Sequence, residues 1–472
     1  MSEVPLCRAG TGRRTTQNSN GEPMKTKQIL FLIILFLPIA APFTKSSFAQ
    51  QVPTSINAVP LPVGSGARAL GMGGAFIAVA DDATAASWNP GGLTQLERPE
   101  LSVVGSFLST HMDFDPGNTG FFSLGNEDVS RGDLNYASVA YPFKVLGKNL
   151  VAALNYQQKY DFHMNVDFDL TDDSLGINED INIDFKSKGG IGALTPAIAM
   201  QVMPKLSIGV AVNIFTDEFF DDFAWKETLK MSGFGTDGVD TINDTAKSVR
   251  EFKNFQAVNV TAGMLWDVWE EEEKCLTFGA VYHSPYTADV DRIIDSQSTS
   301  NFSGSISTFS NHIREHFEID YPMSIGAGWG FRYSDALSLS MDVTWTDWSE
   351  YEQENKETGE ETRPLGLGVS TDRDIDDTYA VRFGTEYLIF RQKMIIPVRG
   401  GLFYEPRPSL DDPTDVYGVS VGSGITFKRF SIDGAYQFRW ANDVDGEDFG
   451  ELQGTHFDLQ EHLFLASVIV YF

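Results

Sequence analysis

The chain has 472 residues, enough for one large domain or two ordinary ones, and its formal net charge is −30. This acidity argues against a nucleic-acid partner, because phosphate binding needs clustered Lys and Arg side chains. Hydrophobic residues make up 42% of the chain, too few for a helical membrane protein of this length, whereas 12% aromatic residues and 43 Gly are typical of a large β structure with many turns.

The N-terminal region carries an export signal. Two lysines precede an apolar stretch at 29–41, and a small-x-small pattern ends at Ala49. These features predict a secretory signal peptide cleaved near Ala49, with translation starting at Met24, so that residues 1–49 form a leader absent from the mature protein. The apolar stretch is too short to span a bilayer as a helix, and no later run approaches 18 apolar residues. We therefore expect an exported protein that no helix holds in a membrane.

Residues 50–97 contain many Gly and Ala residues but no strand pattern. Their glycines could suggest a phosphate-binding loop, but no strand precedes them and no Gly-Lys-Ser or Gly-Lys-Thr follows. We interpret the segment as a compact hatch, a plug that fills a barrel lumen too wide for side chains alone. Its Asn-Pro pair either holds the plug closed or makes an ordinary turn, and its two aspartates either contact barrel arginines or cap a short helix. The candidate hatch and gating residues are Gly71, Asp81, Asp82, Asn89 and Pro90.

From residue 98 onward, apolar residues alternate with small or polar ones in runs of about ten residues. Between Leu206 and Ile214, for example, Leu, Ile and Val occupy every second position. This is the period of a strand, and about ten residues is the length that a tilted strand needs to cross a bilayer. The pattern predicts about 14 strands, at 98–108, 134–143, 149–160, 191–202, 206–215, 253–268, 275–287, 317–333, 336–347, 377–388, 394–404, 415–427, 429–440 and 461–472.

The predicted connections alternate in length. Those after odd-numbered strands are long and polar, as at 161–190, 216–252 and 348–376, whereas those after even-numbered strands are short, as at 203–205. Long outer loops and tight periplasmic turns are typical of an up-and-down transmembrane barrel. We therefore expect an all-β fold, an antiparallel barrel formed by residues 98–472 in a Gram-negative outer membrane, with the hatch in its lumen.

Aromatic residues near the strand ends, including Trp345, Tyr404 and Trp440, are expected at the membrane interfaces. The last residue, Phe472, ends an apolar strand. A terminal aromatic residue resembles the assembly signal that the barrel-insertion machinery reads. We therefore expect outer-membrane lipids and the barrel-assembly machinery among the partners.

Two stretches of the chain resemble a known family. The sequence ARALGMGGAFIAVADDATAASWNPGGL, residues 67–93, is similar to the N-terminal hatch of the FadL/TodX family of outer-membrane transporters, and DVTWTDWS, residues 342–349, is similar to a strand end of that family. Tyr282-His283-Ser284 is a third, shorter match, whereas Gly91 stands where the family usually has Ala. The residues that match the hatch pattern are Gly71, Ala80, Asp81, Asp82, Ala83, Asn89 and Pro90.

The resemblance extends from about residue 55 to 472. It implies passive uptake of long-chain fatty acids, or of other hydrophobic small molecules, across the outer membrane by a plugged, monomeric barrel. Two alternatives stay open, a transporter of aromatic hydrocarbons and a scaffold or shuttle barrel that serves a secretion system. A general diffusion porin would lack the plug.

A fatty-acid ligand would need a cation in the lumen. Strand parity points three arginines inward, where three acidic residues could pair with them. Arginine suits a carboxylate because its fork of donors matches two oxygens. The alternative is a structural ion-pair network that braces the barrel. The candidate ligand-binding residues are Arg382, Arg399, Arg439, Asp342 and Glu386, with Asp433 as a further ion-pair partner.

No metal, cofactor or enzymatic activity is expected. His312-x-x-x-His316 would share one face of a helix, but it lies in a predicted polar outer loop without a third ligand. The acidic loop at 443–448 lacks the full spacing of an EF-hand. No Gly-x-Ser-x-Gly motif occurs, so the sequence gives no basis for a hydrolase.

Overall fold

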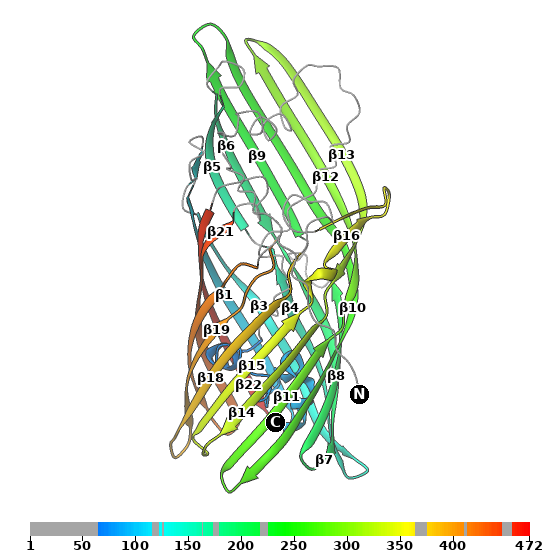
Figure 1. Ribbon diagram of the computed structural model, residues 1–472, viewed down its shortest axis with the longest axis vertical. Helices are drawn as coiled ribbons and strands as arrows, with labels where there is room; N and C mark the ends of the chain where they lie inside the picture. Colours follow the sequence, from blue (N-terminus) through cyan, green and yellow to red (C-terminus); the bar gives the residue numbers. More distant parts are fainter. Residues whose placement is uncertain are drawn as a thin grey trace, which may run out of the picture. The chain divides into compact units, whose positions relative to one another are not determined.

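The predicted leader, residues 1–49, and positions 50–64 of the predicted hatch lie outside the described residues, as do positions 446–448 of the acidic loop. All described residues belong to the unit Phe43–Phe472. Figure 1 shows the computed structural model, which describes residues 65–115, 122–124, 127–162, 164–172, 179–217, 225–363, 375–409, 413–445 and 456–472.

Fourteen strands form the wall of a closed antiparallel barrel, which confirms the predicted fold class (Figure 1). Each wall strand pairs with the next, and the last closes the barrel on the first through pairs from Glu100↔Tyr471 to Asp115↔His456. Closure pairs both edges of every wall strand, which matters in a bilayer because lipid offers backbone groups no hydrogen bonds. The wall strands are β1 (Glu100–Asp115), β3 (Glu127–Val145), β4 (Lys148–Asp161), β7 (Gly190–Met203), β8 (Leu206–Thr216), β10 (Thr241–Glu271), β11 (Lys274–His283), β14 (Ser324–Arg332), β15 (Leu337–Thr346), β18 (Thr378–Phe390), β19 (Ile395–Tyr404), β20 (Tyr417–Thr426), β21 (Phe430–Asp445) and β22 (His456–Tyr471).

Each predicted strand has a counterpart in the wall, but two were predicted too long. The stretch 275–287 runs past the end of β11 at His283 into a strand that begins at Tyr286. The stretch 317–333 is interrupted, because one strand ends at Tyr321 and β14 begins at Ser324. Pro322 lies in the gap. Proline has no backbone N–H to give to a ladder, so it favours a strand end over a strand interior.

The wall is apolar on its outer side. In β8 the side chains of Ile208, Val210 and Ile214 are exposed, whereas Ser207 and Asn213 at alternate positions are buried. This is the reverse of a water-soluble barrel, and it suits a wall whose outer side faces lipid.

The described helices are short. None of those within the described ranges has the length and apolar character needed to cross a membrane. They are α2 (Ala67–Gly71), α3 (Ala85–Trp88) and the 3-10 helix η2 (Pro90–Gln95), all before β1, and the 3-10 helix η5 (Trp348–Glu350).

The prediction of long polar loops was wrong, because these segments contain paired strands. The pairing is extensive: two of the strands pair along their whole length, from Tyr286↔Tyr321 to Phe302↔Ser305. Apolar and polar residues alternate over only part of these strands, so the pattern from which strands were predicted is weak there. We call this extension the outer sheet. It consists of β2 (Phe122–Leu124), β5 (Met164–Asp172), β6 (Glu179–Lys188), β9 (Trp225–Thr236), the outer part of β10, β12 (Tyr286–Phe302), β13 (Ser305–Tyr321), β16 (Glu352–Asn355) and β17 (Glu360–Thr362).

The length of β10 shows how far the outer sheet extends from the wall. It has 31 residues, which at about 3.3 Å per residue gives a strand of about 100 Å. The hydrocarbon core of a bilayer is only about 30 Å thick. In Figure 1, β6, β9, β12 and β13 rise beyond the wall strands at one end of the barrel. The outer sheet therefore extends beyond the membrane on the side with the long connections.

The two histidines considered as a helical pair lie in a strand instead. His312 and His316 belong to β13 and bond to aspartates of β12, with Nδ1 of His312 2.7 Å from Asp295 and Nδ1 of His316 3.1 Å from Asp291. Each histidine therefore belongs to a cross-strand polar pair of the outer sheet.

Candidate functional site

The wall strands enclose the segment Ser65–Leu96, which we call the N-terminal segment. Most of its side chains are buried. The backbone N–H of Ala67 donates to Oγ of Ser467 in β22 at 2.7 Å, and Oγ1 of Thr94 bonds to Oγ of Ser207 in β8, also at 2.7 Å. Since β8 and β22 are well separated around the wall, contact with both requires a position in the barrel interior.

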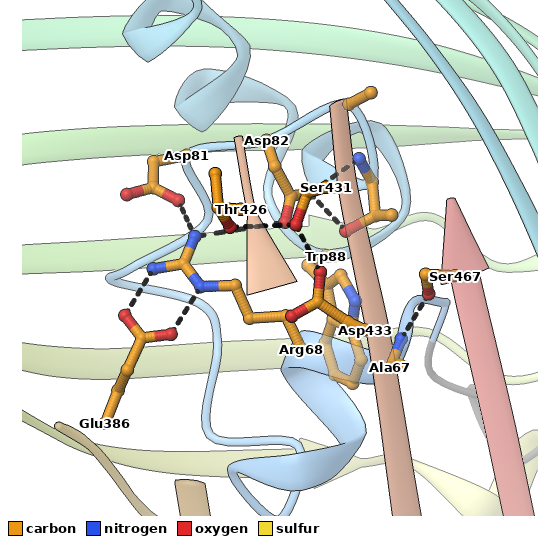
Figure 2. A network of polar contacts seen from close by, with 12 residues as sticks. Ala67, Arg68, Asp81, Asp82, Trp88, Glu386, Thr426, Ser431, Asp433 and Ser467 are labelled. Carbon is orange, nitrogen blue, oxygen red and sulfur yellow. Dashed lines mark hydrogen bonds and ion pairs between the residues drawn. The ribbon is translucent and has the colours of Figure 1, made fainter. Parts of the chain in front are cut away.

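Arg68 joins the N-terminal segment to the wall. Its Nε and Nη2 donate to the two carboxylate oxygens of Glu386 at 3.0 and 3.1 Å, and its Nη1 contacts Asp81 (Figure 2). Arg399 donates from Nε to the same Glu386 at 2.7 Å and from Nη1 to Asp433 at 2.5 Å. Nη1 of Arg68 also lies 3.9 Å from Asp82. The two arginines thus meet four carboxylates, so the charges of Arg68 and Arg399 are compensated.

The two aspartates of the N-terminal segment differ in their hydrogen bonds. Asp81 contacts Arg68 of its own segment rather than an arginine of the wall. Asp82 is buried and accepts hydrogen bonds from the N–H of Thr84 at 2.8 Å and from its Oγ1 at 2.6 Å. Asp82 therefore closes the turn that leads into α3, whose N-cap residue is Thr84.

Asn89 links three backbone groups. Its Nδ2 donates to the carbonyl oxygens of Ile77 and of Met264 in β10, each at 2.8 Å, and its Oδ1 accepts from the N–H of Gly91 at 3.0 Å. Pro90 then begins η2, where its fixed φ suits the first turn. Because Asn89 bonds to both the segment and the wall, it does more than form a turn.

Gly71 and Asp342 mark further close contacts with the wall. The carbonyl of Gly71 accepts from Oγ of Ser420 at 3.1 Å, and a Cβ added to Gly71 would lie 3.0 Å from Cα of Gly422. Asp342 accepts from the N–H of Ile77 at 2.8 Å. Among the described contacts, Asp342 thus binds the N-terminal segment rather than one of the lumenal arginines.

A second cluster in the lumen holds more arginine than acid. Nη2 of Arg382 and Nη2 of Arg439 donate to Glu405 at 2.6 and 3.3 Å, and Nη2 of Arg407 donates to Glu461 at 2.6 Å. Nε and Nη1 of Arg407 and Nε of Arg439 are buried without a hydrogen-bond partner among the described residues. Unbonded buried donors are costly. Three guanidinium groups share two carboxylates, so the cluster has an excess of one positive charge.

Aromatic rings gather where the wall strands pass into the outer sheet. Trp225 and Phe252 stack with 3.8 Å between ring centroids, and Tyr286 lies between Phe215 at 4.8 Å and Tyr321 at 4.7 Å. We call this cluster the aromatic chamber. Its rings are Tyr160, Phe162, Phe215, Trp225, Phe252, Phe255, Tyr286, Phe317, Tyr321, Trp348 and Tyr351.

The aromatic chamber is nearly filled by its own rings. The cavity at its centre, which Arg292 and Gln353 also line, has a volume of about 20 Å³. This is room for about one water molecule. A molecule larger than water could enter this cavity only if the rings around it moved. Sequence reasoning missed the chamber because several of its rings, Trp225 among them, lie in segments predicted as loops.

Buried ion pairs border the chamber on the side of the outer sheet. Arg292 donates to Glu315 at 2.6 Å and stacks over the ring of Phe317 at 4.3 Å. Arg250 lies 3.5 Å from Glu227 in β9. Burial raises the pKa of Glu227 to about 7, although Arg250 partly opposes this effect. The border therefore contains a carboxyl group that titrates near neutral pH.

One cation next to the chamber has no acidic partner. Lys159 precedes Tyr160, at a bulge in the pairing of β4 with β7, and its side chain is partly buried. Its ammonium has no hydrogen bond or ion pair among the described residues. His283, which lies near Lys159, bonds to Oγ1 of Thr261 at 3.0 Å.

Phe472 ends the chain beside the start of the wall. Its N–H donates to the carbonyl of Pro99 at 3.0 Å, and 74% of its surface is exposed. Across the described ranges, no group of three or more His, Cys, Asp or Glu side chains is arranged to hold a metal ion.

A closed barrel with an apolar exterior, a polar lumen and an enclosed N-terminal segment defines the class of outer-membrane β-barrels. The model of the family described as outer membrane protein transport protein (OMPP1/FadL/TodX) matches residues 49–462. The chain belongs to this family. No curated protein matches the chain.

Solved structures share the fold. A FadL homologue from Pseudomonas aeruginosa is 15% identical, with a TM-score of 0.55 over 86% of this chain and 98% of that one. The toluene transporter TodX from Pseudomonas putida is 10% identical, with a TM-score of 0.54 over 87% of this chain and 98% of that one. Sequence identities this low make the likeness one of fold.

Proposed function

We propose that the chain is a passive transporter of hydrophobic small molecules across the outer membrane, with long-chain fatty acids as its preferred ligands. The aromatic chamber carries this proposal. Its buried rings offer an apolar surface at the outer end of the lumen, and burial of apolar ligand surface there contributes about 25 cal/mol per Å². Family membership and the toluene transporter among the structural neighbours support uptake of a hydrophobic compound.

The cations of the lumen favour a ligand with a carboxylate. Lys159 lies beside the chamber without an acidic partner, so an anionic head group there would compensate a partly buried charge. A hydrocarbon chain in the chamber and a carboxylate at Lys159 would occupy adjacent positions. The surplus of arginine at Arg382, Arg407 and Arg439 is a second candidate anion site. Arg399 is balanced by two carboxylates, and we assign it to bracing the barrel.

The N-terminal segment is the plug in this proposal. An open barrel of this size would leak polar solutes, whereas a plugged one releases its ligand when the plug rearranges. Arg68, Asp81 and Asn89 hold the closed form through their bonds to wall and segment. The remaining gating candidates, Gly71, Asp82 and Pro90, act by close packing and by shaping the turns.

Export and assembly complete the proposal. A leader cleaved near Ala49 directs the chain to the periplasm, and the barrel-assembly machinery recognises the strand that ends at Phe472. The mature protein works as a monomer, with outer-membrane lipids around its apolar exterior.

The test is native mass spectrometry of the mature protein in mild detergent, followed by competition with labelled oleate. We expect bound or competable oleate, and we expect Lys159→Gln to weaken oleate binding about tenfold or more. Lys205→Gln is the matched control, because Lys205 is exposed and its ion pair with Glu270 lies at the opposite end of the barrel.

The outcomes separate the candidate ligands. If toluene displaced oleate and Lys159→Gln left binding unchanged, the result would favour aromatic hydrocarbons, since such ligands carry no charge. Binding of neither compound would reject hydrophobic uptake and leave a partner-binding barrel, to be sought by pull-down of secretion components.

A further inference from the structure

The outer sheet presents lysines on its outward face. The outward position follows from the alternation of each strand, because Trp225 and Phe252 point into the aromatic chamber while their neighbours Lys226 and Lys253 are exposed. The pairing of the strands brings lysines together, as in Lys188↔Lys226. We call this cluster the outer lysine patch. It consists of Lys186 and Lys188 of β6, Lys226 and Lys230 of β9, and Lys247 and Lys253 of β10.

The patch gathers six lysines on a chain whose net charge is −30. Asp184 lies 2.9 Å from Lys186 and 3.1 Å from Lys230. Burial acts to raise the pKa of Asp184, but hydrogen bonds from these two lysines lower it overall. Asp184 is thus shared between two lysines. Further carboxylates border the patch: Asp167 of β5 lies opposite Asp184, Asp291 of β12 lies opposite Lys253 and pairs with Arg314, and Asp295 of β12 lies opposite Val249. With Glu251 counted, six lysines and Arg314 face five carboxylates, which leaves a small excess of positive charge.

Glu251 is likewise shared between two lysines. It lies 2.6 Å from Lys226 and 2.5 Å from Lys253. Lys188 and Lys247 have no ion pair among the described residues. The acids fix four of the ammonium groups in place without neutralising the patch, and the other two lysines stay available to an anion.

The patch begins where the lipid-facing band ends. On β10 the exposed apolar side chains of Val258, Val260 and Trp266 face outward, and Lys253 lies five positions beyond Val258. At about 3.3 Å per residue this is about 17 Å along a tilted strand. Lys253 therefore lies at the height of the lipid head groups, with Lys226 and Lys188 close to it, whereas Lys247 lies six positions further along β10, about 20 Å beyond.

We propose that the outer lysine patch binds the phosphate groups of phosphorylated glycolipid head groups in the outer leaflet. Lysines near a membrane surface attract anionic lipid, and an ammonium donates charge-assisted hydrogen bonds to phosphate oxygens. The occupant is a lipid rather than a soluble phosphate, because the patch continues directly from the lipid-facing side of β10. Bound head groups would hold the outer sheet against the leaflet at the level of the aromatic chamber.

The experiment uses the mature protein in mild detergent with two probes, bisphosphorylated lipid A and the same lipid A with its phosphates removed. The variant carries Lys186→Gln, Lys188→Gln, Lys226→Gln and Lys253→Gln. Native mass spectrometry reports the fraction of protein that carries lipid. We expect the variant to bind bisphosphorylated lipid A at least about tenfold more weakly than the unchanged protein.

A matched control carries four Lys→Gln changes at the turns of the opposite end, at Lys144, Lys148, Lys205 and Lys274, and should bind as the unchanged protein does. The heat-dependent gel shift of the barrel checks that each variant is folded. Independently of any variant, salt should weaken binding of bisphosphorylated lipid A to the unchanged protein, since screening acts on exposed charges. Equal binding of the dephosphorylated probe, an equal loss in the control, or salt-independent binding would overturn the proposal.

Discussion

Replacing Arg68 by Gln tests whether ion pairs hold the N-terminal segment in the lumen. The change removes the bidentate bond to Glu386 and the contact with Asp81 but leaves both carboxylates in place. Removing one partner of a buried ion pair costs about 3–5 kcal/mol. Because 22% of the Arg68 side chain is exposed, solvent screens part of this effect, and we expect a loss of about 2 kcal/mol. The population of displaced segments should then rise about thirtyfold.

Hydrogen exchange at the amides of α2 measures this population, and conductance in planar bilayers measures its consequence for leakage. Both should rise in the Arg68→Gln variant. Arg98→Gln is the control, because the Arg98 guanidinium lies over the ring of Tyr471, 4.0 Å from its centroid, and outside the segment. Equal exchange in Arg68→Gln and the unchanged protein would refute the reasoning, and equal acceleration by Arg98→Gln would make the effect unspecific.

Three further predictions concern the chamber and the close contacts of the segment. Trp225→Ala should weaken oleate binding and speed hydrogen exchange in β9, since truncation of a buried aromatic ring costs about 3–5 kcal/mol; unchanged exchange would contradict this. Burial raises the pKa of Glu227 from its ordinary 4.5 to about 7, so folded β9 binds the proton more tightly than the unfolded chain. Its local stability should therefore fall between about pH 4.5 and 7 and level off above, as amide exchange corrected for intrinsic rates would report, and Glu227→Gln should abolish this dependence. Gly209→Ala would drive a methyl group into the main chain of Pro90 and should displace η2 at a cost of about 1–3 kcal/mol; Gly434→Ala, whose added Cβ meets nothing within 4 Å, should leave thermal unfolding unchanged.

The wall strands could be predicted because lipid imposes a strict alternation on them. Every second residue of β8 must be apolar, so the strand is visible in the sequence. No such demand acts on the outer sheet. Asn311 of β13, opposite Ser296 of β12, is exposed, and side chains like these look the same in a strand as in a loop. These residues form strands because they pair with another strand over many positions. Such pairing leaves no local pattern in the sequence from which a strand could be predicted.

The candidate site was predictable to the extent that it lies on wall strands. Parity places Arg399 and Glu386 on the inner side, where both are buried and bonded to each other. No sequence pattern predicts where the Arg68 side chain points, because α2 has only five residues and is too short to show a helical period. Arg407 lies in a connection that sequence reasoning treated only as a loop. Trp225 follows residues outside the described part of the chain and reaches the chamber only through nonlocal pairing.

The pairing of β1 with β22, which closes the barrel, constrains the order in which the parts of the chain can assemble. One edge of β1 cannot pair until β22, the last wall strand, is in place. Ala67 likewise bonds to Ser467, 400 positions away. Such a high contact order makes folding slow, since loop-closure entropy is lost before the distant contacts form. The N-terminal segment precedes β1 but lies in the lumen of the finished barrel. It must therefore enter the lumen before β1 pairs with β22. A chain that ended before β22 would leave one edge of β1 and one edge of β21 unpaired. Unpaired strand edges favour aggregation, so the barrel is protected only after the last strand has been added.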